Sequence, residues 1–338
     1  LETTPGQVRR LSLGHPVLSN QQLTDLSQMD HKGLRSCVID ITFAAGQPSG
    51  FMDAMERICR EASQAIDEGY AFIILSDRNI SQSRIPLSAL IATGAVHQHL
   101  LKNELRSQIG IVVETGEARE VHHHCLLTGY GADAVNPYLA FEALWRANTE
   151  GLLGDKYSNE DSLVAAYKKA VAKGMMKVMA KMGISTLQSY KGAQIFEAVG
   201  LADEIIAKCF AGTASRVQGI NFSVLAEESR RRHTIGYPEK ESERIPVLNN
   251  PGDFHWRTGG DAHMWNPNTI FNLQLAARNN SAEAYAEFAQ HVNEQATRQC
   301  TLRGLMKLRT EQRETIPLGD VEPAREIVKR FATGAMSF

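Results

Sequence analysis

The sequence predicts an α/β fold made of successive βα units with parallel strands. Four short apolar runs rich in β-branched residues lie near the start of the chain, roughly 25–40 residues apart, and helical patterns alternate with them. Strands that are apolar along their whole length are typical of parallel sheets that are buried on both faces. Two arrangements fit this pattern: a partial TIM-barrel-like segment and an open doubly wound sheet.

The elements of this first part follow one another in a regular order. Strands are predicted at CVIDITF, AFIILSD, IGIVVET and ADAVNP, which are residues 37–43, 71–77, 109–115 and 132–137. A helix is predicted after each strand, over residues 52–69, 87–103, 118–131 and 138–148. Because ligands of parallel α/β folds gather at the carboxyl ends of the strands, binding residues are expected directly after these runs.

A long helix is predicted to follow Asn159 and to end at Met182. Asp161 lies near its N-cap, and Gly183 fits the position after a helix that favours a left-handed backbone. One face of this helix carries an apolar stripe made of Met175, Val178, Met179 and Met182. Such a stripe is more often packing than a binding site, so we expect it to lie in the core.

The segment after this helix is predicted to contain a β-type run at residues 184–189 and a short helix at residues 192–200. Residues 230–262 are charged and punctuated by proline and glycine, which indicates a boundary or linker. We therefore divide the chain into a first domain, residues 1–250, and a second domain, residues 251–338.

Two helices are predicted in the second domain. Ser281 precedes an amphipathic helix, and Pro323 lies in the first turn of the last helix, where its missing N–H costs nothing. The chain begins with Leu1 and ends in a small, apolar run that reads as the start of a strand, so we expect it to be a piece of a longer protein.

Composition limits the classes of function. The 338 residues are 43% hydrophobic and 22% charged, with a net charge of −2, which does not indicate a nucleic-acid or anionic-membrane partner. No apolar run approaches the roughly 20 residues of a membrane span. The five cysteines are scattered without metal or redox spacing, which indicates reduced thiols in a cytoplasmic compartment.

Candidate site residues follow the predicted strands. Asp77, Arg78 and Glu114 are the groups that a polar pocket would use, although acids at strand ends more often cap helices or form ion pairs. Lys191 is a weak candidate for a phosphate ligand. Consecutive helical residues point about 100° apart, so the run 122–124 of three histidines cannot converge on one metal ion, and no metal site is predicted.

Several blocks of the sequence, taken together and in this order, resemble one family. They are ILSDR (74–78), GAVHQHL (94–100), the run 114–140, the run 174–201, CFAGTASR (209–216), NPGDFHWRTGG (250–260), CTLRGL (300–305) and the run 321–338. They cover nearly the whole chain and resemble the large subunit of glutamate synthase, an FMN and iron–sulfur oxidoreductase that uses glutamine.

The resemblance implies a place within that subunit. The first domain resembles the later part of the family's central α/β domain, and the second resembles a mostly helical lead-in to an FMN-binding barrel. The last residues resemble the first strand of that barrel, which implies that Ala335, Met336 and Ser337 lie near the flavin in the parent enzyme. No residue of this chain is a candidate catalytic acid, base or nucleophile for the family's reaction.

The resemblance also implies the parent's chemistry, cofactors and partners. Glutamine and 2-oxoglutarate become two glutamates, ammonia passes through an internal channel, and the electrons come from NAD(P)H through a small subunit or from ferredoxin. FMN and an iron–sulfur cluster belong to the parent, and this chain alone is expected to bind neither and to be inactive. Its expected partners are the remaining domains, and its expected location is the cytoplasm, or the plastid in a plant or alga.

Three functions remain open on the sequence. The first is a structural, channel-forming segment of glutamate synthase. The second is a free-standing, non-catalytic α/β scaffold or interaction module. The third is an independent βα enzyme whose pocket contains Asp77, Arg78 and Glu114.

Overall fold

The computed structural model describes residues 10–47, 49–240, 252–298, 301–312 and 314–332. The chain divides into two compact units, Leu1–Ile245 and Pro246–Phe338. Within the described residues, no helix is both long enough and apolar enough to cross a membrane.

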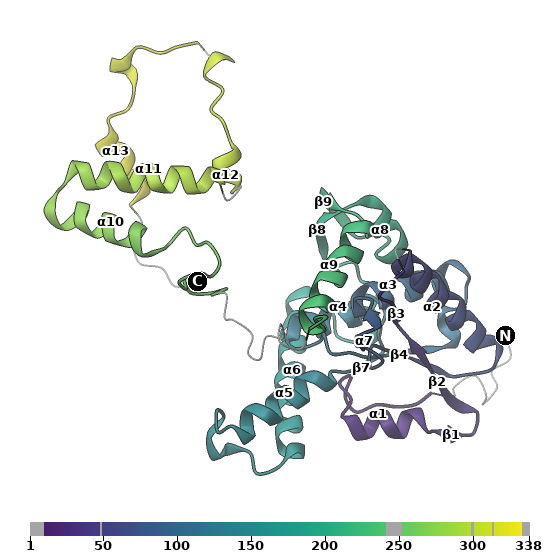
Figure 1. Ribbon diagram of the computed structural model, residues 1–338. Helices are drawn as coiled ribbons and strands as arrows, with labels where there is room; N and C mark the ends of the chain where they lie inside the picture. Colours follow the sequence, from purple (N-terminus) through teal and green to yellow (C-terminus); the bar gives the residue numbers. More distant parts are fainter. Residues whose placement is uncertain (1–9, 48, 241–251, 299–300, 313, 333–338) are drawn as a thin grey trace. The chain divides into compact units, whose positions relative to one another are not determined.

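The first unit is built on a five-stranded mixed sheet (Figure 1). Its strands, in spatial order, are β1 (Asp30–His31), β2 (Leu34–Asp40), β4 (Phe72–Ser76), β6 (Gly110–Glu114) and β7 (Ala134–Asn136). β1 is antiparallel to β2, and the other four strands are mutually parallel and lie in the order in which they occur in the chain. The predicted α/β class with parallel strands is therefore confirmed.

Helices follow the parallel strands as predicted. The helices of this part are α1 (Asn20–Ser27), α2 (Gly50–Asp67), α3 (Ala89–Lys102), α4 (Val121–Gly129), α5 (Tyr138–Thr149) and α6 (Glu160–Met182). In the described part of the chain before the first predicted strand, the structure adds α1 and the short β1, which were not among the predicted elements. The predicted strand at residues 37–43 was wrong in one respect, because it covers the end of β2 and most of β3 (Thr42–Ala44), which belongs to a different sheet. The other predicted elements of this part differ from the observed ones by a few residues at their ends, where local signals are weakest.

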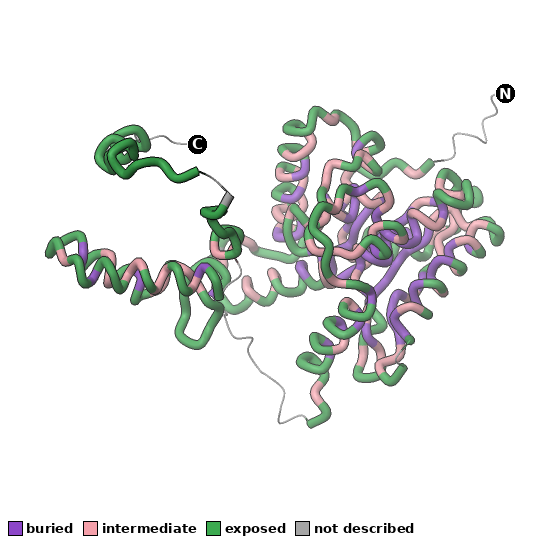
Figure 2. The backbone as a smooth tube through the Cα atoms, turned by 90° about the horizontal axis from the view of Figure 1, so that it is seen from above, coloured by how far each residue is buried: buried purple, intermediate pink, exposed green. Residues whose placement is uncertain are grey.

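Helices cover both faces of the sheet (Figure 1). One face packs against α2 and α3 through Ile73, Leu75, Ile111 and Val113. The alternate residues of the same strands point the other way and pack against Leu23 and Leu26 of α1; they are Ile74, Val112 and Ala134. Burial is accordingly concentrated along the strands and the helix faces that contact them (Figure 2). This two-sided burial explains why β4 and β6 are apolar along most of their length.

Two smaller sheets complete the first unit. β3 (Thr42–Ala44) and β5 (Arg84–Pro86) are antiparallel, and β8 (Glu197–Leu201) is parallel to β9 (Ala214–Ile220). The remaining helices are α7 (Leu187–Tyr190), α8 (Asp203–Cys209) and α9 (Phe222–Gly236). α9 begins with Phe222 packed in the main core and continues into the segment that was predicted to be loop-rich.

The predictions for the segment after α6 were wrong. Residues 184–189 contain the short helix α7 instead of a β-type run, and residues 192–200 end in strand β8 instead of a helix. β8 exists because it pairs with β9, and these two strands form parallel pairs such as Glu197–Ala214 across a gap in sequence. Local periodicity does not report a partner that distant.

The long helix α6 begins and ends close to the predicted residues. Asn159 is the N-cap, with Asp161 close to it in the first turn as predicted, and the Asn159 Oδ1 accepts a hydrogen bond from the Ser162 N–H at 2.9 Å. Gly183 ends the helix with a left-handed backbone, at φ 70°. Of the predicted stripe, Met175 is buried and Val178 and Met179 are partly buried in a core formed with α4 and α7. Met182 is 52% exposed, so the stripe packs over most of its length and not at its end.

The second unit consists mainly of helices. They are α10 (Pro267–Asn279), α11 (Ala282–Arg298), α12 (Leu302–Leu305) and α13 (Ala324–Phe331). α10 and α11 pack against each other, and the hydroxyl of Ser281 accepts a hydrogen bond from the Ala284 N–H at the start of α11. Pro323 lies one residue before α13, at its N-cap. Most residues of this unit are exposed (Figure 2).

Candidate functional site

The polar residues predicted to follow the strands meet at the carboxyl end of the parallel sheet. Asp77 and Arg78 come directly after β4, and Glu114 is the last residue of β6, the neighbouring strand. Arg78 Nε donates a hydrogen bond to Glu114 Oε1 at 2.9 Å, and Ser76 Oγ donates one to Glu114 Oε2 at 2.5 Å. Both oxygens of this carboxylate are therefore held by neighbouring side chains.

Asp77 is the most enclosed of these groups. Its side chain accepts hydrogen bonds from Thr115 Oγ1 at 2.6 Å and from the Gly116 N–H at 2.9 Å. The residue is 4% exposed, and its burial raises the pKa of the carboxyl above the usual value against the opposing effect of these donors. Asp77 thereby ties the end of β4 to the loop that follows β6.

The guanidinium of Arg78 is stacked as well as paired. It lies over the ring of Tyr138 at 3.8 Å from the centroid and donates from Nη1 to Glu142 at 3.3 Å. Burial and the neighbouring Asp77 carboxylate raise the pKa of the Tyr138 hydroxyl. Tyr138 and Glu142, both on α5, therefore close one side of the cluster that Asp77, Arg78 and Glu114 form.

A second ion pair lies at the same end of the sheet, next to β2. Asp40, the last residue of β2, accepts from Arg84 Nη2 at 2.8 Å and from the Thr42 N–H at 2.8 Å. Burial alone would raise the pKa of this carboxyl, but the hydrogen bonds from Thr42 and the charge of Arg84 lower it overall. The pair joins the main sheet to β3 and β5.

Asn136 presents an unpaired acceptor at this edge. It is the last residue of β7 and is fully buried. Its amide nitrogen donates to the Leu18 carbonyl and to Asn20 Oδ1, both at 3.1 Å, which fixes the orientation of the amide. Its Oδ1 has no hydrogen-bond partner among the described residues. An orphaned buried acceptor of this kind can receive an N–H or O–H from a small guest.

Lys191 lies at the other end of the sheet. The prediction that placed it after a strand was wrong because residues 187–190 form α7. Lys191 Nζ instead forms an ion pair with Asp133, the residue before β7, and Asp133 also accepts from Arg106 Nη2 at 3.0 Å. Burial alone would raise the pKa of the Asp133 carboxyl, and the charges of Arg106 and Lys191 lower it overall.

The histidines point apart, as the helical geometry predicts. His122 packs edge-on to Phe196, whereas His123 Nδ1 accepts from the N–H groups of Arg119 and Glu120 in front of α4. His124 is buried, and its Nε2 lies 2.8 Å from the hydroxyl of Tyr167. Within the described ranges, no group of three or more histidines, cysteines and carboxylates is arranged to hold a metal ion.

The described cysteines, which are Cys37, Cys59, Cys125 and Cys209, are free thiols and do not form an iron–sulfur ligand set. Ala335, Met336 and Ser337, the residues that resemble a flavin-proximal strand, lie outside the described residues.

Sequence reasoning missed several members of the cluster at the sheet edge. Tyr138 comes directly after Asn136 and Pro137, so the strand-end rule applied two residues further would have included it. Glu142 lies one helical turn later on α5 and could have been found from its spacing to Tyr138. Arg84 is carried by β5, whose pairing with β3 only the tertiary structure reveals.

A family model described as the glutamate synthase central domain matches residues 1–202, and one described as a conserved region in glutamate synthase matches residues 263–338. The chain belongs to the glutamate synthase family. The resemblance that the sequence blocks indicated is thus confirmed.

Curated glutamate synthases match the whole chain. It is 47% identical to glutamate synthase [NADH] of Schizosaccharomyces pombe and 43% identical to the glutamate synthase [NADPH] large chain of Bacillus subtilis. It is 35% identical to ferredoxin-dependent glutamate synthase 1, chloroplastic/mitochondrial, of Arabidopsis thaliana. All of this chain is covered in each case, and it spans 16%, 21% and 21% of the lengths of these relatives.

Proposed function

We propose that this chain is a structural and channel-forming segment of the glutamate synthase large subunit. The observation that supports it most strongly is the match of the whole chain to about a fifth or less of much longer glutamate synthases. In the parent enzyme, ammonia released from glutamine joins 2-oxoglutarate, and the resulting iminoglutarate is reduced to glutamate. FMN, when bound in the parent, supplies the hydride for that reduction.

The two parts of the chain have different places in this proposal. Residues 1–250 form the central α/β domain. The parallel strands β2, β4, β6 and β7 lie side by side in the order in which they occur in the chain, and this order favours a partial TIM-barrel-like arrangement over a doubly wound sheet. Residues 251–338 form the lead-in to the FMN-binding barrel.

The carboxyl end of the sheet supplies the proposed channel wall. A channel for ammonia needs walls that stay in place and exclude bulk water, together with a few acceptors for N–H groups. The ion pair and hydrogen bonds around Asp77 and Glu114 hold the ends of β4 and β6 and their loops together. The buried, unpaired Oδ1 of Asn136 lies at the same edge and offers an acceptor for an N–H.

The second unit supports the proposal that the remaining domains are partners. Its described residues expose large apolar side chains, among them Phe254 at 91%, Phe331 at 77% and Phe271 at 62%. Surfaces of this kind are normally covered by protein. The names of the relatives indicate NADH, NADPH or ferredoxin as electron sources, so we include a small NAD(P)H-oxidising subunit or ferredoxin among the partners.

We place the FMN and the iron–sulfur cluster in parts of the parent enzyme beyond this chain, with Ala335, Met336 and Ser337 approaching the flavin there. The free state of the described cysteines supports a reducing compartment, the cytoplasm or a plastid.

The proposal is tested in the full-length enzyme with Asn136→Ala. We expect glutaminase activity and ammonium-dependent glutamate formation to stay within about twofold of wild type. Glutamine-dependent glutamate formation should fall by roughly tenfold, which corresponds to the loss of about one hydrogen bond to the passing ammonia, and free ammonia should appear in the medium.

Asn148→Ala is the matched control. Asn148 also has a buried amide oxygen that finds no partner among the described residues, but its amide nitrogen donates to the Tyr157 carbonyl beyond α5, away from the cluster. This variant should leave the coupling between the two activities intact. An Asn136→Ala enzyme that loses ammonium-dependent and glutamine-dependent activity to the same extent, or that stays fully coupled, would contradict the proposed channel role.

A further inference from the structure

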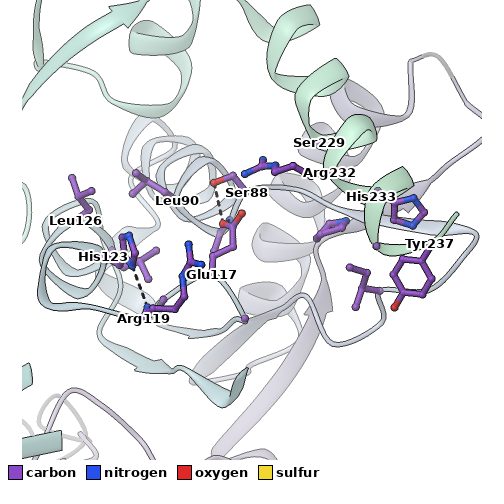
Figure 3. Close-up of a pocket in the computed structure, with 17 residues that line it drawn as sticks. Ser88, Leu90, Glu117, Arg119, His123, Leu126, Ser229, Arg232, His233 and Tyr237 are labelled. Carbon is purple, nitrogen blue, oxygen red and sulfur yellow. Dashed lines mark hydrogen bonds between the residues drawn. The ribbon is translucent and has the colours of Figure 1, made fainter. Parts of the chain in front are cut away.

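A separate pocket of about 470 Å³ lies in the first unit between the start of α3, the loop after β6, helix α4 and the end of α9 (Figure 3). Its volume falls in the range of small-molecule sites. The inner lining is apolar and is formed mainly by Leu90 of α3, Leu126 and Leu127 of α4, and Ala118 of the loop. An apolar surface of this kind suits a hydrocarbon group.

The wall formed by α9 is fixed in place. Phe222 and Ala226 near the start of this helix belong to the main core. Near its end, His233 Nε2 lies 2.8 Å from the Ser81 carbonyl, and its ring stacks on Tyr237 with centroids 4.9 Å apart. The pocket is therefore a preformed feature of the unit.

The acidic side chain in the pocket is already engaged. Glu117 Oε2 accepts from the Ala89 N–H at 2.7 Å and from Ser88 Oγ at 3.1 Å, at the amino end of α3. Its negative charge faces the positive end of that helix. The first N–H groups of α3 are thus partly occupied, which disfavours a phosphate bound there.

Two arginines of the pocket have no such partner. Arg119 comes from the loop after β6 and Arg232 from α9, and Figure 3 shows them on either side of Glu117. Neither guanidinium makes a hydrogen bond or an ion pair with any residue in the described part of the chain. By contrast, Arg231 on the same helix donates to Glu227 at 2.8 Å. The pocket therefore combines an apolar lining with two unsatisfied, exposed cations at its rim.

We propose that this pocket binds a small organic acid that carries its carboxylate on a hydrocarbon body. Arg119 and Arg232 hold the carboxylate, because a guanidinium matches a carboxylate with two parallel hydrogen bonds. The hydrocarbon body lies on Leu90 and Leu126. A strongly hydrated inorganic anion would leave this apolar lining exposed to water, which favours the organic acid. The inference does not depend on the proposed channel role.

The experiment is a calorimetric titration of the full 338-residue chain with 4-phenylbutanoate as the probe. 4-Phenylbutanamide, the neutral counterpart of the same shape, and inorganic phosphate are titrated in parallel. We expect saturable 1:1 binding of the acid, with at least tenfold weaker binding of the amide and of phosphate. Arg119→Gln and Arg232→Gln should each weaken binding of the acid on the order of tenfold, since each removes a charged hydrogen bond.

Arg231→Gln is the matched control, and it should leave binding of the acid unchanged. Because the side chains of Arg119 and Arg232 are exposed and unpaired, both variants should keep the melting temperature of the wild-type chain, and this is checked first. Absence of binding of the acid, equal binding of the amide, or binding that both arginine variants retain in full would each overturn the proposal. Tighter binding of phosphate than of the acid would overturn the organic-acid assignment.

Discussion

At the scale of single residues, two histidines of the first unit, His97 and His124, are buried in surroundings that favour the uncharged imidazole ring. The Nε2 of His124 lies at hydrogen-bond distance, 2.8 Å, from the Tyr167 hydroxyl, and its buried Nδ1 has no hydrogen-bond partner in the described part of the chain. Tyr167 itself donates to the Arg119 carbonyl at 2.8 Å, so its oxygen accepts from His124 and the ring proton lies on Nε2. Burial, and then the neighbouring His123, lowers the pKa of His124 to about 4. Burial and then Arg106 lower the pKa of His97 to about 4.

These shifts predict a loss of stability in mild acid. In the unfolded chain each ring titrates at about its usual pKa of 6.5, so below that pH the unfolded state binds protons that the folded state excludes. The free energy of unfolding should therefore fall as the pH drops from 6.5 towards 4, with roughly 2 kcal/mol lost at pH 5 for each histidine. His124→Gln should remove about one histidine's share of the difference between pH 7.5 and pH 5, measured by urea unfolding.

His122→Gln serves as the control for that measurement. His122 is exposed on the same helix, so its replacement should leave the pH difference as it is in the unmodified chain. A His124→Gln chain with an unchanged pH difference would show that burial of this ring does not set the acid sensitivity.

At the scale of elements, α3 and α8 approach each other closely at one glycine. A Cβ on Gly94 would overlap the carbonyl oxygen of Cys209 and come within 3.0 Å of the ring of Phe210. Gly94→Ala should therefore destabilise the first unit by about 1–3 kcal/mol, although alanine is the better helix former. Thermal unfolding should show this as a lower midpoint.

The contrasting variant is Gly236→Ala. Gly236 ends α9, and a Cβ there would meet no heavy atom within 4 Å. This change should be neutral or stabilising by up to about 1 kcal/mol, because only helix propensity acts. If Gly94→Ala proved equally harmless, the close approach of α3 to α8 would not be a feature of the folded chain.

Elements were predictable where their signal was local. The strand at 110–114 is centred on three β-branched residues, 111–113, and α6 has a cap at Asn159 and a left-handed glycine at Gly183, so sequence alone located them. β8 was not predictable because its existence depends on β9. The sheet-edge site shows the same division: Asp77 and Glu114 follow from the strand-end rule, whereas Arg84 reaches Asp40 through a pairing of β3 and β5 that no local pattern encodes.

At the scale of the whole unit, a buried charge network joins segments that are far apart in sequence. Arg106 donates to His97 Nδ1 at 3.0 Å and to Asp133 at 3.0 Å, and Asp133 also pairs with Lys191. The side chains of Arg106 and Lys191 are each 15% exposed. The network thereby fastens the amino end of the sheet to α3 and to the segment after α7.

Asp133→Asn should destabilise the first unit by about 3–5 kcal/mol, because it leaves two largely buried cations without their counter-charge. Glu197→Gln is the control, since it breaks the Arg216–Glu197 pair, an exposed pair for which a loss below about 1 kcal/mol is expected. Guanidinium unfolding of both variants compares the two losses. Equal losses would mean that burial does not govern the contribution of these ion pairs.

By itself, the sequence determined the α/β class, four parallel strands with their helices, the residues at two strand ends and the family of the chain. All of these depend on short-range patterns or on residues that can be read in order, because burial on both faces of a parallel strand and helix capping leave local marks. The tertiary structure alone decided the pairing of β8 with β9 and the place of Lys191 beside Asp133. It also brought Arg119 and Arg232 to one pocket, because contacts between distant segments form only when the whole chain has packed.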